Sequence, residues 1–67
     1  MRIHLNGQPT DIPDHVHTIQ TLLTWFGVTP DLVVVEKNEE VFKMGQFDAP
    51  IQEEDTIEIV QFMGGGS

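Results

Sequence analysis

Polar and apolar residues alternate at the start of the chain. Ile3 and Leu5 are apolar and their neighbours are polar, a period of two that is typical of a strand with one buried face. Asn6-Gly7 follows, and this pair favours a two-residue type I′ turn because both residues tolerate positive φ. The pattern predicts a hairpin with its second strand at 9–12. We expect that strand at a sheet edge, since Pro9 has no N–H to donate to a neighbour.

A helical period replaces the alternation from Thr18 to Phe26. Apolar residues recur there at i, i+3, i+4 and i+7, which places them on one helix face. The hydroxyl of Thr18 can cap the first turn, and Gly27 can end the helix in a left-handed conformation. Trp25 falls at the edge of the stripe or outside it. The stripe consists of Ile19, Leu22, Leu23 and Phe26.

Short strand patterns fill the second half of the chain. The continuous β-branched run at 32–35 is typical of a buried strand. A polar turn at 37–40 separates it from a short strand at 41–43. After an irregular stretch, alternation returns at 56–62 and predicts the last strand.

The predicted order of elements is strand, strand, helix, strand, short strand, strand. This order indicates an α+β fold of the β-grasp type, with a mixed sheet of four to five strands and one main helix on one face. We expect one domain over 1–62 and a flexible C-terminal glycine tail over 63–67. The predicted core comprises Ile3, Leu5, Ile19, Leu22, Leu23, Phe26, Val33, Val35, Ile57 and Ile59.

Composition narrows the possible functions. The chain of 67 residues has no cysteine, which excludes disulfides, thiolate metal sites, cysteine-ligated clusters and a cysteine nucleophile. Its net charge of −8 argues against binding nucleic acid or an anionic membrane surface. The acidic surface suits a basic partner, or solubility alone. With no apolar run long enough to span a bilayer and no signal-peptide pattern, we expect a cytoplasmic protein.

Few residues are candidates for chemistry. His15 and His17 have the spacing of a metal-ligand pair, but they fall in a predicted loop without an obvious third ligand, so we expect no metal site. The carboxylates gather at predicted turns, where charges are usually solvated, and catalysis would need two of them in a sheltered cleft. We therefore expect no enzymatic activity of the chain's own.

The last strand carries a different kind of signal. With Ile57 and Ile59 on the core face, Val60 and Phe62 point outward, just before the tail. Met63 adds an adaptable apolar side chain. We interpret these three residues as a partner-docking surface. The alternative is that Met1 or a loop covers them.

Four segments resemble one known family, the sulfur-carrier proteins of thiamine biosynthesis, which are ubiquitin-like β-grasp domains. "RIHLNGQP" is similar to their opening hairpin and "TIQTLLTWFGV" to their helix. "VVVEKNEEV" is similar to their strand–turn–strand, and "DTIEIVQFMGGG" to their last strand and tail. Together these segments cover nearly the whole chain, and the glycines after the last strand are the most specific part.

The resemblance implies that the tail is the working part. In the family, an adenylating, ubiquitin-activating-like enzyme uses ATP to activate the terminal glycine carboxylate. A sulfur donor protein then supplies the sulfur of a thiocarboxylate, which is delivered to thiazole synthase. By this resemblance Gly66 is the reactive residue, Gly64 and Gly65 thread through the partner's site, and the chain binds no cofactor and is a monomer when free.

The terminal residue departs from the family. Family chains end in glycine, whereas Ser67 follows Gly66 here. Ser67 is an appended residue, or it is removed before activation, or the chain is inactive as it stands. Two further readings stay open: the small sulfur-carrying subunit of molybdopterin synthase, and a β-grasp interaction module that is never activated.

Overall fold

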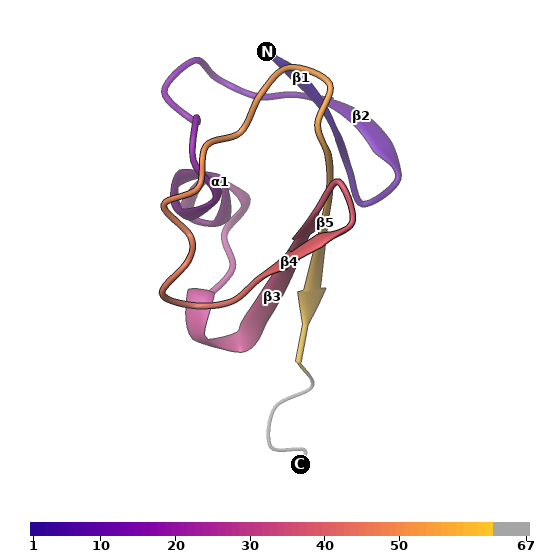
Figure 1. Ribbon diagram of the computed structural model, residues 1–67. Coiled ribbons are helices and arrows are strands. Elements are labelled where there is room, and N and C mark those ends of the chain that lie inside the picture. Colours follow the sequence, from indigo (N-terminus) through magenta and orange to yellow (C-terminus); the bar gives the residue numbers. More distant parts are fainter. Residues whose placement is uncertain (63–67) are drawn as a thin grey trace.

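The computed structural model describes residues 1–62, which form a five-stranded sheet with one α-helix against one face (Figure 1). The sheet order is β2-β1-β5-β3-β4; β1 and β5 are parallel, and the other neighbours are antiparallel. This confirms the predicted β-grasp, while the expected tail at 63–67 lies outside the described residues. The elements are β1 (Arg2–Leu5), β2 (Gln8–Asp11), α1 (Ile19–Phe26), a 3₁₀ turn (Pro30–Leu32), β3 (Val33–Lys37), β4 (Glu40–Phe42) and β5 (Thr56–Gln61).

Two tight turns connect the hairpins. Asn6 and Gly7 have φ of 51° and 84° between β1 and β2, which confirms the predicted type of turn. Asn38 and Glu39 adopt φ of 50° and 74° between β3 and β4, so the second turn also uses two left-handed residues. β2, which contains Pro9, is an edge strand as predicted.

The first turn of α1 has partners for all its backbone N–H groups. Thr18 Oγ1 accepts from the Thr21 N–H at 3.2 Å, and Thr21 Oγ1 accepts from the Thr18 N–H at 3.0 Å, a reciprocal capping arrangement. The N–H groups of the first two helical residues donate to the carbonyls of Ala49 and Phe47, at 3.1 and 2.8 Å. The N–H of Leu22 donates to the Thr18 carbonyl. The loop between β4 and β5 is therefore fastened to the start of the helix.

Most of the predicted core is buried between α1 and the sheet. Ile59 is half-buried and packs against this core. Two loops that lacked any periodic signal contribute further buried side chains. The core observed is Ile3, Leu5, Ile12, Val16, Ile19, Leu22, Leu23, Val33, Val35, Phe47, Ile51 and Ile57.

The prediction that Phe26 is buried was wrong, because its side chain is 44% exposed. Phe26 is the last residue of α1, and the chain turns away at Gly27, where φ is 94°. It lies with Trp25 beside the β1–β2 hairpin, at the margin of the core. The loop side chains Phe47 and Ile51 are buried in the core instead.

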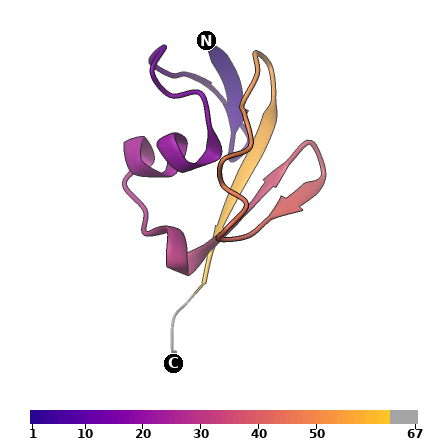
Figure 2. The same cartoon turned by 60° about the vertical axis from the view of Figure 1, so that its left-hand side comes forward.

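The two faces of the sheet differ. Figure 2 shows α1 on one side of the sheet, where the core lies. The opposite face, here called the open face, presents every second residue of β3 and β5 to solvent. Within residues 1–62, no helix is long and apolar enough to cross a membrane.

Candidate docking surface on the open face of the sheet

β5 is the central strand of the sheet and leads directly to the tail. Its pairing with β3 extends one residue past the strand, because the Phe62 N–H donates to the Leu32 carbonyl at 2.7 Å. Val60 and Phe62 are 49% and 51% exposed, so they face outward as predicted. Their role in docking stays a prediction. Met63 and the glycines at 64–66 lie outside the described residues.

An apolar patch surrounds the end of β5. Val34 lies directly opposite Val60 in the β3–β5 register, and Leu32 is 41% exposed beside Phe62. The sequence assigned Leu32 and Val34 to a buried strand, and only the register with β5 shows that they belong to this surface. We call Leu32, Val34, Val60 and Phe62 the apolar patch. Met1 packs against the core instead and does not cover it.

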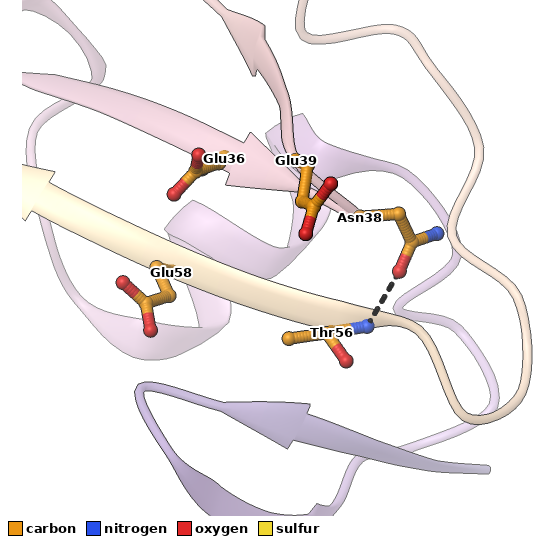
Figure 3. Close-up of a pocket in the computed structure, with 5 residues that line it drawn as sticks. All are labelled: Glu36, Asn38, Glu39, Thr56 and Glu58. Atoms are coloured by element: carbon orange, nitrogen blue, oxygen red, sulfur yellow. Dashed lines mark hydrogen bonds between the residues drawn. The ribbon is translucent and has the colours of Figure 1, made fainter.

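A hollow with an acidic lining lies further along the same two strands (Figure 3). Glu36 on β3 is directly opposite Glu58 on β5, and Glu39 stands in the adjoining turn. The hollow has a volume of about 470 Å³, and Asn38 and Thr56 complete its lining. None of the ion pairs found in residues 1–62 involves its three carboxylates. We call this feature the acidic hollow.

Hydrogen bonds fix one end of this hollow. Asn38 Oδ1 accepts from the Thr56 N–H at 2.9 Å, as Figure 3 shows, and Asn38 Nδ2 donates to Asp55 Oδ1 at 2.9 Å. The other oxygen of Asp55 accepts from the Gln52 N–H at 2.8 Å. Asp55 is only 7% exposed, so its carboxylate depends on these donors. The turn after β3 is thereby tied to the start of β5.

The histidines considered for a metal site do not come together. His15 and His17 are exposed, and His4 Nε2 lies 3.0 Å from Glu54 Oε1. Across residues 1–62, no three histidine, aspartate or glutamate side chains are grouped so as to hold a metal ion.

One ion pair joins β1 to β2 at the edge of the sheet and shifts the pKa of both its members. The Arg2 Nε donates to Asp11 Oδ1 at 2.9 Å. This hydrogen bond and the opposite charge lower the pKa of Asp11 and raise the pKa of Arg2. Both groups are on the surface, so this pair is a solvated contact between β1 and β2.

A sheet in this order, with one helix on one face and a central last strand that leads to glycines, defines a β-grasp domain of the ubiquitin-like type. The family model of the ThiS family matches residues 3–66. The chain belongs to the ThiS family. It is therefore a small sulfur carrier of thiamine biosynthesis rather than an enzyme. The match places it in the thiamine branch, which the sequence alone had left open against the molybdopterin synthase subunit.

Relatives and solved structures agree with this assignment. A sulfur carrier protein ThiS of Bacillus subtilis is 34% identical over 65 residues, covering 96% of this chain and 98% of that protein. A thiazole synthase of Magnetococcus marinus is 43% identical over 67 residues, and this chain spans 20% of its length.

Two solved structures of a thiamine biosynthesis protein (ThiS) from Geobacter metallireducens share the fold. The crystal structure has a TM-score of 0.81 at 30% identity, over 98% of this chain and 100% of that one. The NMR structure has a TM-score of 0.80 at 31% identity, over 100% and 90%.

Proposed function

We propose that this chain carries sulfur as a thiocarboxylate on Gly66, in a form from which Ser67 is absent. The Gly66 carboxylate attacks the α-phosphate of ATP on an activating enzyme, which forms an acyl-adenylate and releases pyrophosphate. Sulfide supplied by a donor protein then attacks the carbonyl carbon, so that a C–S bond forms as the C–O bond to AMP breaks and AMP leaves. The net change on the carrier is one oxygen replaced by sulfur, and thiazole synthase is the proposed acceptor.

The position of the apolar patch is the observation that best supports this proposal. Val60 and Phe62 are exposed on the last strand, directly before the segment that holds the glycines. Glycine has no Cβ, so a backbone of Gly64 and Gly65 can pass through a narrow enzyme site. A patch beside such a segment can hold the domain while the carboxylate reacts.

Thiazole synthase as acceptor is supported by the Magnetococcus relative. That protein is named a thiazole synthase, and a segment of it resembles 98% of this chain. A single protein that is named a thiazole synthase thus contains a segment similar to this chain. We infer that the chain described here meets a thiazole synthase as its partner.

Intact-mass spectrometry tests the proposed function. A chain ending at Gly66 is incubated with ATP, the activating enzyme and the sulfur donor system. We expect a mass gain equal to sulfur minus oxygen, with no gain when ATP is omitted. The chain that retains Ser67 is the matched control and should stay unmodified. No mass gain on the trimmed chain would instead support an interaction module that is not activated.

A further inference from the structure

We propose that the acidic hollow receives an arginine or lysine side chain of the activating enzyme, while the apolar patch beside it receives an apolar side chain. This inference rests on the proposed function, because it names the chemistry of the partner that docks on the open face. The two features form one docking surface with an acidic end and an apolar end.

The like charges of Glu36 and Glu58 are the first support. These residues are directly opposite each other on neighbouring strands, where two carboxylates repel and weaken the pairing. Glu39, held at positive φ in the next turn, adds a third carboxylate to the same hollow. A cation placed between these groups would turn their repulsion into attraction.

The chain offers no cation of its own to this hollow within residues 1–62. Arg2 is paired with Asp11, and Lys37 Nζ donates to the Pro50 carbonyl at 3.0 Å. Lys43, the remaining lysine, lies beyond β4, and His4 Nε2 is 3.0 Å from Glu54 Oε1; neither residue lines the hollow. A net charge of −8 further favours a basic partner surface. A side-chain cation paired with these carboxylates would therefore come from another molecule.

Continuity with the apolar patch is the second support. Val60 follows Glu58 by two residues on β5, and Val34 precedes Glu36 by two on β3, so all four share the open face. The hydrogen bond between Asn38 and Thr56 keeps the acidic end in a fixed shape. An arginine can bridge two carboxylates with its planar fork while its stem covers apolar surface, which makes it the best-suited occupant.

The double variant Glu36→Gln/Glu58→Gln tests the proposal. We expect its affinity for the activating enzyme, measured by calorimetry, to fall about tenfold or more, because a partner cation loses its counter-charges. Its affinity should also depend less on salt than that of the wild type. The double variant should nevertheless melt ~1–5 °C above the wild type, because the repulsion between the two carboxylates is removed.

The control Asp14→Asn/Asp48→Asn makes the same change in net charge on two exposed loop residues. We expect it to bind almost as well as the wild type. If the control loses as much affinity as the double glutamine variant, overall charge and not the acidic hollow explains the loss. Unchanged binding of the double glutamine variant would also overturn the proposal.

The mass assay separates failure of this inference from failure of the proposed function. If the chain ending at Gly66 gains sulfur while the double variant binds the activating enzyme as well as the wild type does, the acidic hollow alone is disproved. A wild-type chain ending at Gly66 that neither gains sulfur nor binds the activating enzyme disproves both.

Discussion

The side-chain oxygen of Asn6 accepts a hydrogen bond from the backbone N–H of Ile59 at 2.8 Å. The Asn6 N–H in turn donates to the Ile57 carbonyl at 2.9 Å. Between β1 and β5 the strands themselves pair at only two positions, so this turn residue lengthens their contact. Asn38 binds the beginning of β5 from the other hairpin turn. Two asparagines at positive φ therefore hold the strand that leads to the tail.

Replacing Asn38 with alanine should destabilise the fold. The change leaves the Thr56 N–H and the Asp55 carboxylate without their Asn38 partners. It also places alanine, whose side chain makes no local hydrogen bond, at φ of 50°. We expect a loss of ~2–4 kcal/mol in the free energy of unfolding. Urea denaturation followed by circular dichroism measures it. Asn38→Gly, which relieves only the backbone strain, should recover ~1 kcal/mol; equal stability of the two variants would mean that strain contributes nothing.

The N-terminal cap of α1 should contribute measurably to the free energy of unfolding. Thr18→Ala removes the hydroxyl that accepts from the Thr21 N–H, and we expect it to cost ~1 kcal/mol of unfolding free energy. Thr24→Ala, an exposed threonine in the middle of the same helix, is the matched control and should change stability by less than ~0.5 kcal/mol. Equal losses in both variants would argue that the cap is not important.

Phe62 should matter for binding more than for folding. Half of its side chain is already exposed, so Phe62→Ala should reduce the free energy of unfolding by no more than ~1 kcal/mol. Affinity for the activating enzyme should fall about tenfold or more, as for an aromatic anchor. Met44→Ala, another exposed apolar residue but one outside the apolar patch, should leave binding unchanged. Severe unfolding of the Phe62 variant would contradict the exposed position.

The Arg2–Asp11 pair should make stability depend on pH in acid. The pKa of Asp11 is lower in the folded chain than its ordinary value of 3.8, because Arg2 donates to its carboxylate and attracts its charge. The folded state therefore takes up this proton less readily than the unfolded state. The contribution is full above the ordinary pKa and disappears as the pH falls through the lowered one.

Thermal melting across this acid range, with Asp11→Asn beside the wild type, measures the effect. The variant should lose part of the acid dependence, by a small amount because the pair lies on the surface and is screened by salt. Asp48→Asn, an exposed carboxylate in a loop, should melt with the wild-type pH dependence. If the melting temperature of the Asp11→Asn variant fell more steeply in acid than that of the wild type, the predicted direction would be wrong.

The features that could be predicted from sequence were those set by neighbouring residues. Asn6-Gly7 selected its turn, Thr18 capped the helix, and alternation in the last strand placed Phe62 outward. Phe26 was misplaced because a helical stripe does not say where the sheet beneath it ends.

Contacts between distant segments left no local signal. Phe47 and Ile51 are single hydrophobic residues in an irregular loop, and their burial depends on how that loop crosses the start of the helix. The pairing of Glu36 with Glu58 requires the register of two strands that lie far apart in sequence. The acidic hollow therefore could not be predicted, although both of its strands were.

The parallel arrangement of β1 and β5 also determines how the domain bears mechanical load. The two strands are neighbours that run in the same direction, so β1 starts at one end of the sheet and β5 finishes at the other. A pull on the C-terminus with the N-terminus held acts along β5 and shears its hydrogen bonds with β1 and β3 together. These hydrogen bonds would have to break together rather than one after another. A load on the C-terminus is therefore shared among all of these hydrogen bonds.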